Sequence, residues 1–596
     1  MKKAILPFLL LFLIIPAVSA KQGHIPLLAI KETEQGLEGS IADLYLEIQE
    51  GKGRVFLDTF PLTKVDTQIS ARLAKDVACS FLDIDCSNYD FIYMIKADST
   101  IIGGPSAGAA AAILTISLLD DLYLSEQIAI TGTINPGGII GPVGGVKEKI
   151  EAAAKKGMKK ALIPQGKRFV KEEPEVVKIG NIEIGRSKIG NETIDLVEYG
   201  EKLGIKVVEI ASLNDVIYEF TGKKTSNITK GLVIDSNYTE TMKKLAVDLC
   251  SRNEELQKSL SRFKIDDKEL LLVKNETINL TAKGKEAFDS GIYYSSASYC
   301  FGANVKSSYL LLLLQNLTKD KILEKEAMAR AKIQDFDKKI GEKQIKTITD
   351  LESYIVVKER LIEAEDYLDL AIKNLNDTKK SISNLAYSLE RINSAYSWFF
   401  FFDSRGKEFN LNKDILKSSC QDKISEAEER HEYVKLFLPT VLENAEKETG
   451  YAYSYMEKGD YELCLFKASK AKAEADIVLN VIGVEEDQLD NLLNQKLNIV
   501  KNNIIKEAEK GIFPILGYSY YEYASTLKDS DRSSALLYSE YALELSNLDI
   551  YFEEKEKVQF KKIEENLVLI FVAGIFVGFI IGFSFKKKSV KTKRKH

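Results

Sequence analysis

A serine follows a glycine-rich turn at 103–108, where the sequence reads GGPSAG. Glycine and proline favour a sharp turn, and the small residues around Ser106 predict a helix over 106–119. Backbone N–H groups at a helix N-terminus stabilise an anion, so Ser106 could attack a carbonyl carbon beside amides that bind the resulting oxyanion. The alternative is that Ser106 only caps the helix, because serine is a favoured N-cap residue.

A nucleophilic serine also needs a base. The sequence has three histidines, and only His24 lies in the same region, which argues against a Ser-His-Asp triad. Residues 141–149 read GPVGGVKEK and place Lys147 and Lys149 in the first turn of a predicted helix. A lysine shielded from water loses its proton more readily and can act as a general base. The alternative for each lysine is an ordinary position on an exposed helical face.

The elements that would hold these residues follow a mixed α/β pattern over 24–222. Asp66 is expected to cap an amphipathic helix, and 166–200 reads as an irregular insertion. The predicted strands are 37–48, 53–60, 91–97, 127–134 and 160–164, and the predicted helices are 66–82, 106–119 and 146–156.

Three motifs occur in order: GGPSAG, ITGTI at 130–134, and GPVGGVKEKIEAAAKKGMKKALIP at 141–164. Together they resemble the proteolytic domain of the Lon protease family. The resemblance implies that Ser106 is the nucleophile and Lys149 the general base, and their separation of 43 residues matches the family. It also implies that Thr131 lies near the lysine. The other supporting residues of the motifs are Gly104, Pro105, Ala107, Gly132, Gly144 and Gly145.

The resemblance implies a serine endopeptidase that needs no metal and no cofactor and acts on protein or peptide substrates. It also implies a homo-oligomer, with a hexameric ring as the expected form. Two departures from the family stand out. Family members usually carry an aspartate where this chain has Gly103, and many carry histidines in the strand at 91–95. The sequence also has no Walker motif G-x-x-x-x-G-K-[ST], so activity without ATP on unfolded or flexible proteins is expected.

The alternative reading is an inactive Lon-like domain that serves as a peptide-binding or oligomerisation module of a membrane-tethered helical scaffold. Gly103 is the main sequence feature in its favour.

The composition of the chain argues against several classes of protein. With 596 residues, 45% hydrophobic and 29% charged, the chain is too long for one small domain and too apolar for a disordered protein. The net charge is −6 and many cations lie at the two ends, so the body is acidic and no nucleic-acid partner is expected. The absence of CxxC and HExxH patterns argues against structural or catalytic zinc.

The ends of the chain predict export and a membrane anchor. Residues 1–20 read as a signal peptide, with an uncleaved anchor helix as the alternative. Residues 567–585 contain no charge and predict a transmembrane helix, and the basic segment 586–596 predicts a cytoplasmic tail. The expectation is a single-pass protein of the cell membrane whose N-terminal body is extracytoplasmic.

The cysteines and the glycosylation sequons also fit an exported protein. Cys79 and Cys86 are close enough in sequence to form a disulfide, while the pairing of the other four cysteines stays open. Seven N-x-T sequons predict N-glycosylation, with chance matches in polar loops as the alternative. They are Asn191, Asn227, Asn237, Asn275, Asn279, Asn316 and Asn376.

Residues 230–565 have helical periodicity, which predicts an all-α region with coiled-coil or helical-hairpin packing. The segments 287–293 and 455–461 are similar and resemble the turns of tetratricopeptide-like repeats, but no regular period joins them. A helical bundle is therefore favoured over a repeat array. An a/d seam is expected at Leu361, Ala364, Leu368, Ala371 and Leu375.

The predicted fold class is thus an α/β Lon-type protease domain, an all-α helical region and one C-terminal transmembrane helix.

Overall fold

The structure is a computed structural model of the chain. The residues that it describes are 20–33, 36–102, 104–171, 176–179, 182–186, 193–224, 231–402, 408, 412–436, 438, 442–547 and Gly574.

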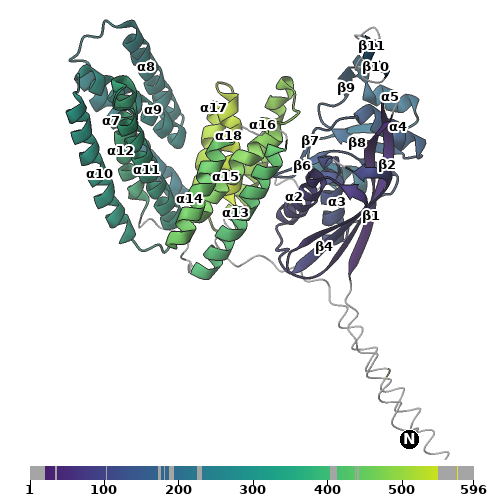
Figure 1. Ribbon diagram of the computed structural model, residues 1–596. Helices are drawn as coiled ribbons and strands as arrows, with labels where there is room; N and C mark the ends of the chain where they lie inside the picture. Colours follow the sequence, from purple (N-terminus) through teal and green to yellow (C-terminus); the bar gives the residue numbers. More distant parts are fainter. Residues whose placement is uncertain are drawn as a thin grey trace, which may run out of the picture.

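The N-terminal part is built on a seven-stranded sheet with the strand order β13-β8-β5-β1-β2-β4-β3 (Figure 1). β1, β2 and β4 pair antiparallel, whereas β3 is parallel to β4 and β1, β5, β8 and β13 are parallel to one another. The strands are β1 (Lys21–Thr33), β2 (Gly36–Glu50), β3 (Val55–Thr63), β4 (Tyr89–Ile102), β5 (Ile128–Ile130), β8 (Lys160–Pro164) and β13 (Lys206–Ile210).

Neighbouring residues of a strand point to opposite sides of the sheet, and helices cover both of its faces. Leu27 of β1 packs with α2, α3 and α6, while Leu28, the next residue, packs with α4 and α5. The hydrophobic core is thereby divided into two layers. The helices are α2 (Val65–Leu82), α3 (Gly108–Leu119), α4 (Val146–Lys155), α5 (Leu196–Lys202) and α6 (Leu213–Thr221).

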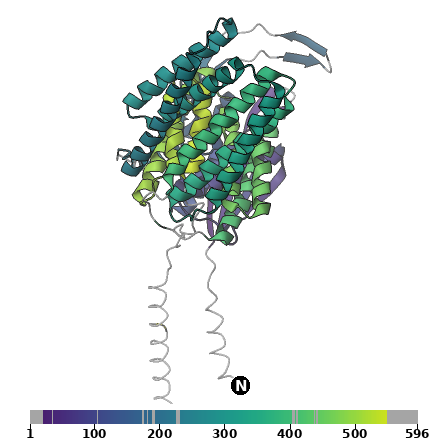
Figure 2. The same cartoon turned by 90° about the vertical axis from the view of Figure 1, so that its left-hand side faces the viewer.

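The segment expected to be irregular, 166–200, forms short strands instead. β9 (Phe169–Lys171) pairs with β12 (Thr193–Asp195), and β10 (Val176–Ile179) pairs with β11 (Ile182–Arg186). Figure 2 shows the β10–β11 hairpin projecting from the molecule.

The described part of the chain from α7 onward is helical, as the periodicity predicts. In Figure 1, α13 to α18 lie between the helices α7 to α12 and the α/β part. The helices are α7 (Ser236–Leu260), α8 (Lys268–Asp289), α9 (Tyr293–Leu314), α10 (Lys319–Gly341), α11 (Ile348–Lys373), α12 (Thr378–Trp398), α13 (Lys413–Lys435), α14 (Glu443–Lys458), α15 (Tyr461–Val481), α16 (Leu489–Glu509), α17 (Ile515–Leu527) and α18 (Arg532–Ser546).

The predicted a/d seam lies on α11, and four of its five residues are buried, while Leu375 lies just beyond the helix. It faces α12, so α11 and α12 form a helical hairpin. The two similar segments are both turns between helices: Gly291 follows α8 and Gly459 follows α14, with φ of 76° and 75°. That left-handed conformation explains the glycine in each segment, and the resemblance between them is that of two helical hairpins.

The helical region is docked on the α/β part. Ile69 of α2 packs in one hydrophobic cluster with Tyr433 and Val434. Next to them, the Arg430 guanidinium lies 3.4 Å from the Asp76 carboxylate of α2. α13 therefore contacts α2, the helix that also packs against the core of the sheet.

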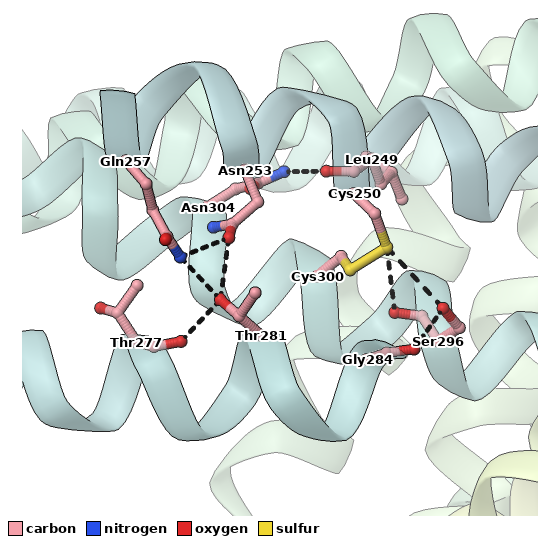
Figure 3. The surroundings of a disulfide bond; sticks show 10 residues. All are labelled: Leu249, Cys250, Asn253, Gln257, Thr277, Thr281, Gly284, Ser296, Cys300 and Asn304. Atoms are coloured by element: carbon pink, nitrogen blue, oxygen red, sulfur yellow. Dashed lines mark hydrogen bonds between the residues drawn. A yellow bond between two sulfur atoms is a disulfide. The ribbon is translucent and has the colours of Figure 1, made fainter. Parts of the chain in front are cut away.

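Three disulfides join the six cysteines in pairs. Cys79 of α2 is bonded to Cys86. Cys250 of α7 is bonded to Cys300 of α9, and Figure 3 shows this bond between two helices that run in the same direction. The third bond ties α13 to α15 through Cys420 and Cys464.

The prediction of a transmembrane helix has to be corrected. In the part of the chain that the structure describes, no helix is long and apolar enough to cross a membrane. Even the 26-residue α11 carries charged residues along its length. The segment 567–585, apart from Gly574, lies outside the described residues, as do 1–19 of the signal-peptide prediction and the tail 586–596. The prediction of a transmembrane helix in the fold class, and of a single-pass location at the cell membrane, is therefore wrong for the described part of the chain.

Candidate active site

Ser106 lies in a short 3-10 turn, η1 (Pro105–Ala107), between β4 and α3. Gly104 precedes this turn with φ of 98°, a conformation that side chains with a Cβ rarely adopt. α3 begins at Gly108, with Ala107 at its N-cap and no side-chain hydrogen bond to the helix. Ser106 therefore does not cap the helix, and the capping alternative is wrong.

The turn packs closely on its neighbours. A Cβ at Gly108 would lie 2.9 Å from the backbone nitrogen of Ile134 and 2.8 Å from Ser70 Oγ. Both distances are shorter than a carbon can tolerate, so this position requires glycine. The close approach brings Ser106 against the strand that carries the second motif.

The second motif links the serine to the lysine. Thr131 and Gly132 lie between β5 and β6 (Thr133–Asn135). Gly132 N–H donates to the Ser106 carbonyl oxygen at 3.2 Å. On the adjacent residue, Lys149 Nζ donates to Thr131 Oγ1 at 3.1 Å. The structure thus brings Ser106 and Lys149 to the same dipeptide, from two different helices.

Lys149 lies in the first turn of α4, which begins after Gly145 with φ of 63°. Its side chain is almost completely buried, with a residue exposure of 2%. Burial lowers the pKa of Lys149 to about 8, because it penalises the charged form, while the Glu148 carboxylate acts in the opposite direction. Lys147 differs from it: its ammonium lies 5.7 Å from the centroid of the Tyr199 ring, and its side chain is half-buried.

Other buried lysines in the described part of the chain have a different environment. Four of them lie in the helical region, and each is paired with a carboxylate. Burial alone would lower the pKa of Lys470, yet the Glu359 carboxylate at 2.6 Å raises it well above its usual value. The pairs are Lys467 with Glu448, Lys470 with Glu359, Lys472 with Asp476 and Lys496 with Glu540. Among the described residues, no carboxylate lies within ion-pair distance of Lys149 Nζ.

Two residues of α2 that the sequence pattern does not reveal support Gly104 and Pro105, the residues just before Ser106. Asp66 was expected to cap α2, but the N-cap residue is Lys64. Asp66 Oδ2 instead accepts a hydrogen bond from Gly104 N–H at 3.0 Å, and Ser70 Oγ donates to the Pro105 carbonyl at 3.3 Å. A polar residue on the first turn of a helix gives no sequence signal of such a contact, because the partner lies 38 residues away.

Three other glycines belong to the turns of the first and third motifs. Gly144 is exposed and Gly145 precedes α4, while Gly103 lies outside the described residues. In the described ranges no group of three His, Cys, Asp or Glu side chains could hold a metal ion.

Five of the seven sequon asparagines are described and all five are exposed, whereas Asn191 and Asn227 are not described. Glycosylation at any of them stays a prediction. The five exposed residues are Asn237, Asn275, Asn279, Asn316 and Asn376.

Residues 79–194, which include Ser106, Thr131 and Lys149, match the family model of the Lon protease (S16) C-terminal proteolytic domain. The chain carries a Lon-type proteolytic domain. The resemblance that the three motifs indicate is thereby confirmed, and no match to an ATPase domain accompanies it.

Relatives agree with this assignment over the same part of the chain. A stretch of 119 residues is 39% identical to a Lon protease of Paraburkholderia phytofirmans, covering 19% of this chain and 15% of that protein. A stretch of 115 residues is 36% identical to an archaeal Lon protease of Methanocaldococcus jannaschii, covering 19% of this chain and 17% of that protein. A third, of 151 residues, is 31% identical to an archaeal Lon protease of Halobacterium salinarum, covering 24% and 20%. The similarity therefore spans a small part of these relatives and leaves the helical region unmatched.

Proposed function

We propose that this protein is a serine endopeptidase that cleaves peptide bonds with a dyad of Ser106 and Lys149 and without ATP. The observation that carries the proposal is the buried Lys149, whose pKa is lowered to about 8 and whose ammonium contacts Thr131, next to the residue that binds the Ser106 backbone. The Lon-type domain that contains all three residues supports it.

In the proposed mechanism, neutral Lys149 takes the proton from the Ser106 hydroxyl as the serine oxygen attacks the carbonyl carbon of the substrate. Backbone N–H groups of Ser106 and Ala107 bind the oxyanion. Protonated Lys149 then gives its proton to the leaving amine, and the acyl-enzyme forms. Lys149 deprotonates a water molecule that hydrolyses the ester, and the serine is regenerated.

Thr131 accepts a hydrogen bond from Lys149 Nζ and so keeps the amine directed toward the catalytic turn. Gly108 lets the turn pack closely on its neighbours, and Gly104 adopts the positive φ with which the turn begins. These groups act on the position of the dyad rather than on the bond that breaks.

The proposed substrates are unfolded proteins and flexible segments of folded ones. The sequence has no Walker motif with which to bind ATP, so a substrate has to present an extended segment by itself. Assembly into a homo-oligomer stays a prediction from the resemblance, and light scattering on the purified protein would test it.

The test is cleavage of unfolded casein by the purified full chain in the absence of ATP. We expect cleavage by the wild type, and a loss of about 1000-fold or more in Ser106→Ala and Lys149→Ala. Lys147→Ala is the matched control, because it removes a lysine from the same helical turn without touching Thr131, and it should retain activity. Cleavage that survives both dyad substitutions would assign the activity elsewhere, and a folded wild type that cleaves nothing would favour the inactive, peptide-binding alternative.

A further inference from the structure

The first turn of α2 forms most of the support behind the catalytic turn. Asp66 uses both carboxylate oxygens: Oδ1 accepts from Thr67 N–H at 2.7 Å and Oδ2 accepts from Gly104 N–H at 3.0 Å. Thr67 Oγ1 lies 3.5 Å from the Gly104 carbonyl oxygen. Together with the bond from Ser70 to Pro105, three consecutive polar groups of the backbone just before Ser106 are held by this one helix.

We propose that Asp66 is a positioning residue for Ser106, acting through Gly104. This inference rests on the proposed function and names a further residue on which that function depends. Asp66 does not touch the reacting atoms. It fixes the direction of the Gly104 N–H, and thereby the peptide plane from which the turn carrying the nucleophile starts.

The backbone of Gly104 explains why such a fixing contact is needed. With φ of 98°, and with no atom within 4 Å of the place where a Cβ would lie, Gly104 has both the conformational freedom and the space to rotate. A rotation of this peptide would turn the Gly104 N–H away and displace Ser106, two residues further on. The two-point attachment of the Asp66 carboxylate opposes that rotation, because its other oxygen is already anchored to the helix.

α2 itself is held from its other side by the helical region. Ile69, one turn from Asp66, packs against Tyr433 of α13, and Asp76 faces Arg430. Burial raises the pKa of Tyr433, and the negative charge of Asp66 adds to the effect. The helix that carries Asp66 is therefore fixed between the catalytic turn and α13.

The placement of Asp66 also bears on the departure at Gly103. Where the resemblance leads one to expect an aspartate within the turn, this chain has glycine. A carboxylate nevertheless reaches the turn, from a different element. The contact at Gly104 needs an acceptor on a short side chain, which aspartate supplies.

The test compares Asp66→Ala, Asp66→Asn and a matched control, Gln68→Ala, in the full-length protein. Gln68 lies on the same turn of α2 with its side chain exposed. Initial rates on a fluorogenic peptide give kcat and KM, and hydrogen exchange followed by mass spectrometry reports on the amide of Gly104. Asp66→Ala should lower kcat by about 10- to 100-fold with KM little changed, because a nucleophile displaced by about 1 Å loses rate rather than affinity.

Asp66→Asn keeps an acceptor oxygen for Gly104, so it should lose clearly less activity than Asp66→Ala, and Gln68→Ala should match the wild type. The Gly104 amide should exchange faster in Asp66→Ala than in the wild type. A kcat within twofold of the wild type, equal losses in the Ala and Asn variants, or unchanged Gly104 exchange would each overturn the inference. The exchange measurement does not need turnover, so it separates a failure of this inference from a failure of the proposed function.

Discussion

The activity of the dyad should depend steeply on pH, because only neutral Lys149 can accept the serine proton. With its pKa at about 8, Lys149 is neutral in roughly 9% of molecules at pH 7, in about half at pH 8 and in roughly 91% at pH 9. We therefore expect kcat/KM to rise about tenfold between pH 7 and pH 9, with a midpoint near 8. If the base were an exposed lysine with an ordinary pKa, kcat/KM would still be rising at pH 10.

The assay is the initial rate of cleavage of a short fluorogenic peptide from pH 6 to pH 9.5, at substrate concentrations well below KM. Under this condition the profile reports the free enzyme. Circular dichroism at each pH confirms that the fold persists. Lys149→Arg should be inactive over the whole range, because a guanidinium keeps its proton, while Lys147→Arg should keep the profile of the wild type.

Two results would refute the reasoning. A flat profile between pH 6 and pH 9 would mean that no group with a pKa near 8 limits the reaction. A rising profile with the same midpoint in an active Lys149→Arg would assign the titration to another residue. Either outcome would remove Lys149 from the role of general base.

Three further predictions concern the cost of the buried lysine, its hydroxyl partner and the helical region. Burial of charged Lys149 costs roughly 3 kcal/mol of folding free energy below pH 8, so Lys149→Met should be inactive yet more stable than the wild type in urea at pH 7. The pH-dependent part of this gain should fall to about half at pH 9.5, because the wild-type lysine becomes neutral there. An equal gain at both pH values would contradict the lowered pKa. Thr131→Val removes the hydroxyl acceptor that favours the charged form of Lys149, so the midpoint of the pH profile should move below 8 and kcat should fall by about tenfold. An unchanged midpoint would exclude the hydrogen bond between Lys149 and Thr131. Replacing Cys250 and Cys300 together by serine should destabilise the helical region by about 2–4 kcal/mol in urea unfolding, because the bond closes a loop of 50 residues, and identical midpoints for the two proteins would speak against a disulfide there.

The sequence predicts the elements of the α/β part well where their patterns are local. The strand expected at 91–97 is part of β4, and the helices expected after the glycine turns are α3 and α4. The strand expected at 127–134 is divided into β5 and β6 at Thr131 and Gly132, which contact Lys149 and Ser106. A run of β-branched and small residues does not reveal such a break, since both strands have the same pattern.

Contacts between distant segments could not be predicted in this way. Arg430 meets Asp76 across 354 residues of sequence, and the Asp66 carboxylate meets Gly104 from another element. Each of these residues alone is typical of an exposed helical face. Arg430 and Asp66 have these partners only because α13 packs on α2 and α2 packs on the turn that carries Ser106.

The two lysines of the third motif have different environments, which the sequence pattern alone does not predict. The helical pattern alone does not distinguish Lys147 from Lys149, and only the family resemblance singles out Lys149. In the structure Lys147 is half-buried beside an aromatic ring, whereas Lys149 is enclosed. The buried lysines of the helical region each have a carboxylate partner, as a stable interior requires. Lys149 has a hydroxyl partner, which orients the amine and stabilises its charged form less than a carboxylate would. An apolar residue would fill that place at lower cost, so the arrangement does not serve the stability of the fold, and it supports the proposed role of Lys149 as a general base.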